Sequence, residues 1–327
     1  MLKSKLSYFF SIAAAVMLVV LTNSCSNPSD EIKQKSTVLE LINSQPNLSI
    51  YKTAIETAGL NSYLSATNYT YFVPTNAAFQ QFLSDNNYSA ITDVPVPILK
   101  QIMLNHLMIG LQKSTNLYTG YFSTLATGTA SATNNLNIYV AFDSNSILLN
   151  GVSKIITADV IANDGVLHIV DTVLILPNIL TQLTANANFT SLLAALTLGN
   201  QSLPLNYFKN TLSDSNTKTF FAPTNAAFTS FNTEFGYTTT NTIALSLQDQ
   251  ILRYHIVTGT NYFLNSFVNN QTITTNQGAG LLVQLSVNSI ENYVKLQDTN
   301  NRQAAIVYKN IQCSNGMIHI IDKVLKP

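Results

Sequence analysis

The stretch Tyr71-Phe72-Val73-Pro74-Thr75-Asn76-Ala77-Ala78-Phe79 predicts a strand that runs directly into a helix. Aromatic and β-branched residues favour a short strand as far as Pro74, which stops it because proline has no N–H group for strand pairing. Thr75 is a good helix N-cap, and the apolar residues after it have helical spacing. The stretch recurs 149 residues later as Phe220-Phe221-Ala222-Pro223-Thr224-Asn225-Ala226-Ala227-Phe228, so the chain carries this strand and helix twice.

Two further blocks repeat in the same order. The helical pattern that ends in Asn105-His106-Leu107 recurs as Tyr254-His255-Ile256, again at an offset of 149. The block Gly165–Leu174 recurs as Gly316–Leu325 at an offset of 151. All four histidines of the chain fall at matched positions. We therefore predict two tandem domains that pack closely with almost no linker, at residues 35–177 and 178–327.

Each unit is expected to be helical in its first half. Residues 37–42 and 50–60 have helical spacing. Pro97 suits the first turn of a further helix, which places Ile98, Ile102 and His106 on one face. Gly110, and Gly259 in the second unit, suit the ends of these two histidine-bearing helices.

The second half of each unit is expected to be β-structure. Apolar and polar residues alternate in Leu136–Phe142 and Leu281–Val287, as they do in half-buried strands. Asn150-Gly151 is a tight-turn dipeptide. The closing runs Val166–Leu176 and Met317–Leu325 are expected to be core strands. The fold class is therefore α+β.

Together these blocks resemble the fasciclin domain. Thr219–Phe228 is similar to the first signature segment of the family almost throughout, and Thr70–Phe79 differs from it at Val73. The Tyr-His motif of the family is present as Tyr254-His255 and altered to Asn105-His106 in the first copy. The closing segment of the family is matched in both copies, at Asp164–Pro177 and Asn315–Leu325.

This resemblance covers nearly the whole chain after its N-terminal segment and implies a fold and a functional class. The fold would be two tandem fasciclin-like domains, each a β-sandwich or wedge flanked by helices. Members of the family are typically secreted or surface-anchored adhesion and interaction modules. They bind proteins or glycans and share no known catalytic chemistry, so we do not expect an enzyme.

The N-terminus has the pattern of an export signal. Lys3 and Lys5 precede the apolar run Phe9–Leu21, whose 13 residues span about 20 Å as a helix, too short for a hydrocarbon core of about 30 Å. Small and polar residues then lead to Cys25, which resembles the lipidated cysteine of a bacterial lipoprotein. The alternative is ordinary cleavage nearby. We predict a signal peptide at residues 1–24, lipidation of Cys25 and a tether at residues 25–34.

Composition and charge limit the partners. Only 10% of the residues are Asp, Glu, Lys or Arg, and the formal net charge is zero, so we expect no nucleic-acid partner. The pair Asp30-Glu31 resembles the surface-export signals of Bacteroidota lipoproteins. The expected location is the outer membrane, lipid-anchored and exposed at the cell surface, with the membrane contacted through the anchor alone. An extracellular protein or a polysaccharide is the expected partner.

The matched histidines are the main candidates for chemistry. His106 and His255 share an apolar helix face, which favours a structural role with hydrogen bonds to backbone carbonyls. An interaction site formed by Asn105 and His106, and by Tyr254 and His255, is the alternative. We expect no catalytic residue, metal or cofactor, because no metal-ligand spacing and no nucleophile-elbow motif is present. Two loops with exposed tyrosines could form a binding face, Asn116–Phe122 and Gly259–Phe267.

We therefore expect a lipid-anchored cell-surface protein that acts in adhesion or interaction. One alternative is a glycan-binding accessory lipoprotein of a nutrient-uptake system. A structural envelope protein is another, and a hydrolase is disfavoured by the missing motifs.

Overall fold

The computed structural model describes residues 36–143, 146–201, 204, 206–287 and 292–327. The signal peptide, Cys25 and the tether that we predict lie outside the described residues. Contacts join Ser36–Pro327 into one compact unit, which contains both predicted repeats.

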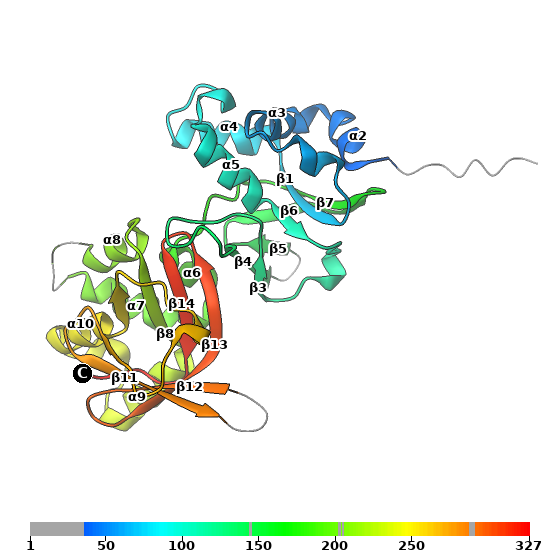
Figure 1. Cartoon of the computed structure of the whole chain (residues 1–327). Helices are drawn as coiled ribbons and strands as arrows, with labels where there is room; N and C mark the ends of the chain where they lie inside the picture. The colour runs from blue at the N-terminus through cyan, green and yellow to red at the C-terminus, as the bar shows by residue number, and fades with distance from the viewer. Residues whose placement is uncertain (1–35, 144–145, 202–203, 205, 288–291) are drawn as a thin grey trace, which may run out of the picture. The chain divides into compact units, whose positions relative to one another are not determined.

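The first repeat places its helices before most of its strands (Figure 1). The helices are α2 (Val38–Asn43), α3 (Ser49–Thr57), α4 (Asn76–Asp85) and α5 (Val96–Asn105). The strands are β1 (Tyr69–Pro74), β2 (Leu107–Ile109), β3 (Gly120–Ser123), β4 (Asn137–Asp143), β5 (Ser146–Leu149), β6 (Ser153–Ile161) and β7 (Gly165–Val170). The strand order in the sheet is β2-β1-β7-β6-β5-β4-β3, and of these pairs only β1 and β7 are parallel.

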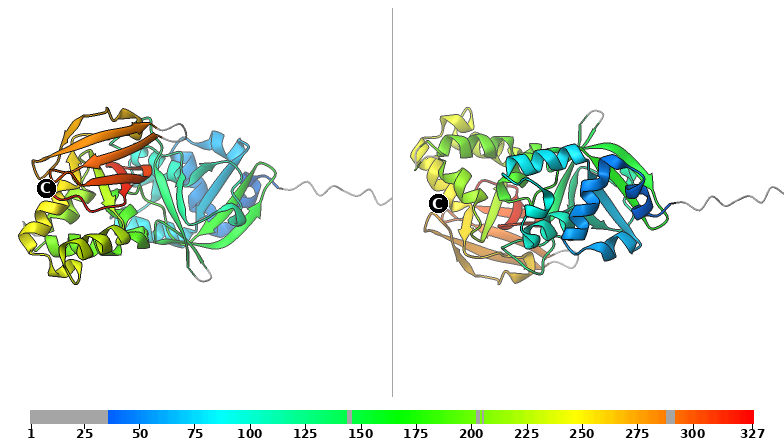
Figure 2. Two further views of the ribbon diagram at one scale, coloured as in Figure 1. Left: turned by 90° about the horizontal axis from the view of Figure 1, so that it is seen from below. Right: turned by 90° about the horizontal axis from the view of Figure 1, so that it is seen from above.

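The second repeat has the same arrangement. Its helices are α6 (Ile179–Ala185), α7 (Thr190–Gly199), α8 (Tyr207–Ser213), α9 (Asn225–Phe235) and α10 (Leu245–Tyr254). The strands are β8 (Lys218–Pro223), β9 (Ile256–Thr258), β10 (Thr272–Thr274), β11 (Gly280–Val287), β12 (Asn292–Gln297), β13 (Gln303–Cys313) and β14 (Gly316–Ile321). The strand order is β10-β11-β12-β13-β14-β8-β9, which is the order of the first sheet read from the opposite edge, and β8 and β14 are again parallel. Figure 2 shows helices α7 and α10 on one side of these strands.

The repeated strand-helix segment lies at the centre of each domain. Phe72 pairs with His168 across β1 and β7, and Phe221 pairs with His319 across β8 and β14. Thr75 and Thr224 cap helices α4 and α9 by accepting hydrogen bonds from the N–H groups of Ala78 and Ala227. The α+β class and the arrangement in two tandem repeats are confirmed.

Two details differ from the sequence-based expectation. Helices α5 and α10 end at Asn105 and Tyr254, well before Gly110 and Gly259, which instead follow the short strands β2 and β9. The helices end early because the carbonyl groups that follow them accept hydrogen bonds from the sheet. Phe72 N donates to His106 O, and Phe221 N donates to His255 O, both at 2.9 Å.

The closing strands are also shorter than expected. Strand β7 ends at Val170 and β14 at Ile321, because an aspartate follows each of them. Asp171 Oδ1 accepts a hydrogen bond from Lys154 N at 2.8 Å, and Asp322 Oδ1 accepts one from Ala305 N at 2.7 Å. These side chains take the place of a ladder bond and end the pairing.

The two repeats share a buried boundary. Tyr121 and Tyr139 of the first repeat belong to the hydrophobic core cluster of the second. Asn186 Nδ2 donates to Tyr121 Oη at 3.0 Å, and Gln312 N donates to Asn137 Oδ1 at 2.8 Å. The close packing that we expect from the missing linker is therefore present.

Candidate functional site

His106 and His255 form the same pair of hydrogen bonds in the two domains. Nδ1 of each ring lies 2.8 Å from the carbonyl oxygen four residues earlier, of Ile102 or Ile251. Nε2 of His106 accepts from Leu174 N at 2.9 Å, and Nε2 of His255 accepts from Leu325 N at 3.0 Å. Each ring therefore connects the end of a helix to the segment that follows strand β7 or β14.

These bonds fix the charge of both rings. Because Nε2 accepts, Nδ1 must be the protonated nitrogen, and the ring is neutral. Burial, which disfavours the charged form, lowers the pKa of His106 and of His255 to about 4. With exposures of 0% and 1%, neither side chain can reach a partner or substrate at the surface.

His168 and His319 are satisfied in a different way. Nε2 of His168 lies 2.8 Å from Gln112 O, and Nε2 of His319 lies 2.9 Å from Tyr262 O. Nδ1 accepts from Asp159 N in the first domain and from Asn310 N in the second. The rings also stack on Phe72 and Phe221. Burial lowers the pKa of His168, and it lowers that of His319 to about 4.

Asn105 and Tyr254 occupy equivalent buried positions. Asn105 Nδ2 donates to the carbonyl oxygens of Leu174 and Ile175 at 3.1 Å, and Oδ1 accepts from Thr124 Oγ1. Tyr254 Oη donates to Gly280 O at 2.7 Å. Both side chains are 0% exposed. In this conformation, the four residues of the candidate interaction site bind backbone within their own domains.

The described part of the chain offers little for metal or thiol chemistry. It holds no group of three or more His, Cys, Asp or Glu side chains able to bind a metal ion. Cys313 is buried in the core of the second domain, and burial raises the pKa of its thiol. A thiol in such surroundings stays protonated and unreactive.

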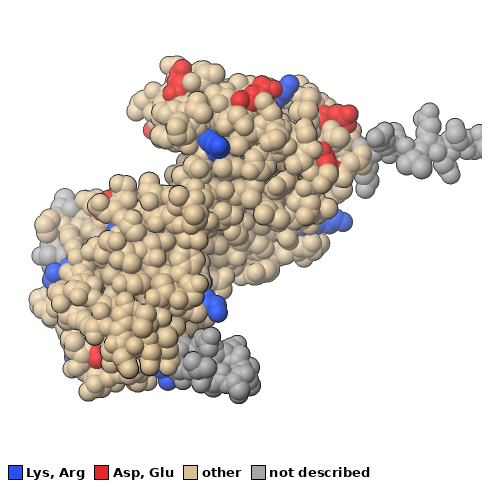
Figure 3. All heavy atoms as spheres, viewed as in Figure 1, with Lys and Arg blue, Asp and Glu red and all other residues tan. Residues whose placement is uncertain are grey.

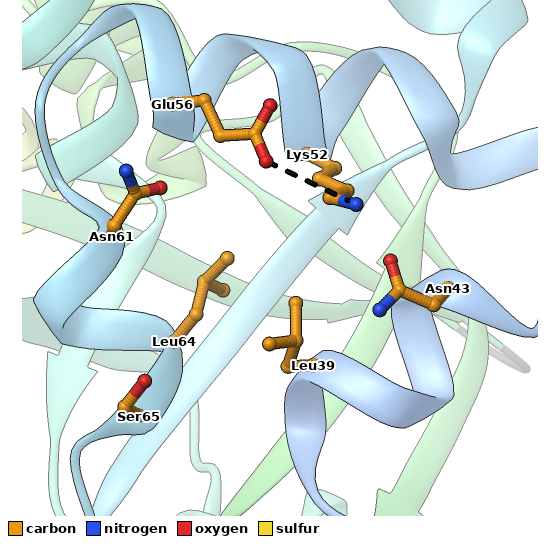
Figure 4. A pocket seen from close by; sticks show the side chains of 7 residues that line it. All are labelled: Leu39, Asn43, Lys52, Glu56, Asn61, Leu64 and Ser65. Carbon is orange, nitrogen blue, oxygen red and sulfur yellow. Dashed lines mark ion pairs between the residues drawn. The ribbon is translucent and has the colours of Figure 1, made fainter.

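One surface hollow, with a volume of about 430 Å³, opens between α2, α3 and the turn that follows α3 (Figure 4). Leu39 and Leu64 supply its apolar part, and Lys52 pairs with Glu56 at 3.9 Å on its wall. The paired side chains are 38% and 49% exposed, so solvent screens them. The hollow resembles a shallow surface feature more than an active site.

The two candidate loops differ in exposure. In the first, Tyr118 is 60% exposed and its ring contacts Phe122, with 4.6 Å between centroids. In the second, Phe267 is buried and packs on Tyr262 and His319. Of the tyrosines in these loops, only Tyr118 is exposed, because Tyr121 is buried and Tyr262 is partly buried.

Charged side chains are sparse on the molecular surface. In the view of Figure 3, Lys, Arg, Asp and Glu atoms form scattered spots on a largely uncharged face. Among the described residues, no helix is long and apolar enough to cross a membrane.

The family model for the fasciclin domain matches residues 46–177 and 187–327. The chain is 26% identical over 283 residues to mouse stabilin-2. This match covers 83% of this chain and 10% of stabilin-2. It is 28% identical over 296 residues to a fasciclin-like arabinogalactan protein of Arthroderma benhamiae, and this match covers 83% of this chain and 64% of that protein. It is 26% identical over 262 residues to human periostin, and this match covers 80% of this chain and 28% of periostin. The chain thus spans less than two thirds of these relatives.

A solved structure is also similar to this chain. It is a domain pair from the insect cell adhesion molecule fasciclin I, with a TM-score of 0.49 and 18% identity. The similarity covers 85% of this chain and 96% of that one.

Proposed function

Because the chain belongs to the fasciclin domain family, we propose that it is a cell-surface adhesion and interaction protein. Its partner would be an extracellular protein or polysaccharide. It acts by binding and not by catalysis, since its four histidines are buried and hydrogen-bonded to backbone groups of their own domains. The observation that carries the proposal is that two fasciclin domains occupy nearly all of the chain from residue 46 onward.

The proposal includes a lipid anchor. Cys25 follows a short apolar segment and precedes a polar tether, as in lipoproteins of the Bacteroidota type. Several acyl chains on one cysteine would hold the protein stably on the outer membrane, exposed at the cell surface. The domain pair then presents its surface a short distance from the membrane.

Intact-mass measurement of detergent-extracted protein tests the anchor. A mass increment of acyl size is expected in the wild type and should be absent in Cys25→Ala. An unmodified protein that begins at another residue would contradict the anchor.

Binding is tested with the acyl-free protein, residues 26–327, on arrays of glycans and extracellular matrix proteins. Saturable binding to a member of either class is expected. If neither class binds, the proposed function is wrong.

A further inference from the structure

The boundary between the two domains joins two unlike faces. The second domain contributes three residues on and directly after α6 and on β13, which we call its docking face: Gln182, Asn186 and Tyr308. The first domain contributes three residues of the outer strands β3 and β4, which we call its receiving face: Tyr121, Asn137 and Tyr139.

Direct contacts join these two faces. Gln182 Nε2 donates to Asn137 O. Asn186 Nδ2 donates to Tyr121 Oη at 3.0 Å, and the rings of Tyr121 and Tyr308 lie 5.4 Å apart between centroids. Gln182 and Asn186 are buried, with exposed fractions of 0% and 3%. The boundary therefore pairs the docking face of one domain with the receiving face of the other.

Because the two domains share one fold, the first domain has a docking face as well. Its residues are the counterparts of those in the second domain: Leu41, Gln45 and Thr157. The first lies on α2 and the second is the N-cap of the short helix that follows, as Gln182 and Asn186 are for α6 and the helix after it. Thr157 lies at the register irregularity of β6, as Tyr308 does in β13. Thr157 is exposed and the other two are partly exposed.

The second domain likewise has a receiving face of its own. Its residues lie on β10 and β11, the counterparts of β3 and β4: Thr272, Gly280 and Leu282. Thr272 pairs with Leu282 across these strands, as Tyr121 pairs with Tyr139 in the first domain. Thr272 is exposed and the other two are partly exposed. One docking face and one receiving face are thus left without a partner domain in the described part of the chain.

The apolar positions of the two unpaired faces match each other. Within the chain, Gln182 donates to a backbone carbonyl of the receiving face. The corresponding carbonyl in the second domain, Gly280 O, already accepts from Tyr254 Oη at 2.7 Å. A donor would find no free partner there, and the unpaired docking face offers none, since Leu41 takes the place of Gln182. An apolar side chain at this position instead packs well on the neighbouring Leu282.

The polar positions match too. Gln45 and Thr157 belong to the unpaired docking face, and Thr272 belongs to the unpaired receiving face. Their side chains form no hydrogen bond with any residue that the structure describes. These amide and hydroxyl groups are therefore free to bond with one another across a contact. Little like-charge repulsion opposes that contact, because the formal net charge of the chain is zero and only 10% of its residues are charged.

We infer that the docking face of the first domain binds the receiving face of the second domain of another copy of this chain. The molecules then associate head to tail, through a contact that repeats the boundary within each molecule. Such a contact joins two different surfaces, so every added copy presents a fresh docking or receiving face, and the assembly grows into an open row. This self-association goes beyond the proposed function and requires no ligand.

The contact between molecules should be weaker than the boundary within one molecule. In the first domain, the segment Thr124–Leu136 reaches across the boundary, where Ala130 N donates to Ser314 O at 3.0 Å. The corresponding segment of the second domain, Thr275–Ala279, is much shorter, so this hydrogen bond has no counterpart between molecules. We therefore expect association that is reversible and depends on concentration.

Sedimentation velocity of the acyl-free protein, residues 26–327, tests the inference. The average mass of the wild type should rise past that of a dimer between about 5 and 500 µM, the range of weak contacts. Leu41→Lys and Leu282→Lys should each weaken association at least about tenfold, because a lysine would place an unpaired charge in the contact. Ile98→Lys and Leu245→Lys, at exposed positions outside both faces, are the controls and should associate as the wild type does.

Mixing the two variants tests the head-to-tail geometry. Leu41→Lys keeps an intact receiving face and Leu282→Lys keeps an intact docking face, so an equal mixture should form a dimer that does not grow. Thr157→Lys and Thr272→Lys, at exposed positions of the same two faces, form a second pair that should behave alike. Circular dichroism melts verify that each variant is folded.

Three outcomes would overturn the inference. The first is a wild type that stays monomeric over the whole concentration range. The second is association that closes at a dimer and is unaffected by Leu282→Lys, which would indicate a symmetric contact between two docking faces. The third is an equal mixture of folded variants that stays monomeric for both pairs.

Discussion

His106 and His255 each form hydrogen bonds with two backbone groups that lie far apart in the sequence. His255 accepts from Leu325 N and donates to Ile251 O, so it attaches the C-terminal segment to helix α10. His106 does the same for Leu174 and Ile102 in the first domain. Leaving a buried polar group without its partner lowers the free energy of unfolding by roughly 1–3 kcal/mol, whereas an intact hydrogen bond contributes only about 1 kcal/mol.

We predict that His255→Ala destabilises the protein by about 3 kcal/mol or more, since it leaves two buried backbone groups unpaired at roughly 1–3 kcal/mol each. Urea unfolding of the wild type and the variant measures this change. His106→Ala should produce a similar loss and serves as an internal replicate. An unchanged unfolding midpoint together with lost ligand binding would show that Tyr254-His255 is a recognition site.

The same rings predict a dependence of stability on pH. His106, His255 and His319 have folded-state pKa values of about 4, below the unfolded value of about 6.5. Between these values the unfolded chain binds protons that the folded protein excludes. The free energy of unfolding is therefore at its plateau above pH 6.5. It falls with acidification by about 1.4 kcal/mol per pH unit for each of these histidines, until pH 4 is reached.

Urea unfolding between pH 7 and pH 5 tests this slope in a range where most carboxylates stay ionised. His255→Gln removes one titrating group and should reduce the slope by about 1.4 kcal/mol per pH unit. Equal slopes in the wild type and the variant would contradict the assignment.

At the scale of elements, the Thr-Asn pair at the start of α4 and α9 has two distinct tasks. The threonine caps its own helix, whereas the asparagine holds a different one. Asn225 Oδ1 accepts from Ser191 N, at the start of α7, and its Nδ2 donates to Ala187 O. Asn76 forms the corresponding bonds with Ile50 N and Pro46 O in the first domain.

We predict that Thr224→Ala costs about 1 kcal/mol, the usual value for an N-cap. Asn225→Ala should cost about 2 kcal/mol, because it removes two hydrogen bonds to another element. Chemical denaturation of the two neighbouring variants compares them directly. If Thr224→Ala were the more damaging change, the role of Asn225 in helix packing would be refuted.

At the scale of the whole molecule, the boundary between the domains is part of the core. Tyr121 and Tyr139 pack into the second domain, and Ala130 N donates to Ser314 O at 3.0 Å. Gly128 lies so close to Ser314 that a Cβ atom would overlap its backbone. The two domains should therefore unfold together.

Calorimetry should show one cooperative transition for the wild type and a broader or split transition for Gly128→Val, since the valine side chain forces the boundary apart. Val152→Ala, at an exposed position of the first domain, provides a control that should leave the single transition unchanged. Two separate transitions in the wild type would show that the boundary contributes no coupling.

Local patterns in the sequence were sufficient to predict the repeat, the strand-helix segments and the α+β class. Thr75 and Thr224 act within one turn of a helix, and the alternation in Leu136–Phe142 correctly predicts strand β4. The expected burial of one face is wrong, because Ile138, Tyr139 and Val140 are all buried and Phe142 is 50% exposed. Burial of His106 and His255 one turn after Ile102 and Ile251 was also predictable, whereas Ile98, expected on the same face, is 50% exposed. Such features depend on neighbours three or four residues away, so the sequence contains them directly.

Only the tertiary structure decided the rest, because it depends on residues that are distant in the chain. The lengths of β7 and β14 are set by Asp171 and Asp322 binding another strand, and helix α5 ends where the His106 carbonyl meets Phe72. Asn105 and Tyr254 became structural residues once their partners, about 70 and 26 residues further along, were in place. The meeting of Tyr121 with Tyr308 arises from the packing of one domain on the other, which no local pattern encodes.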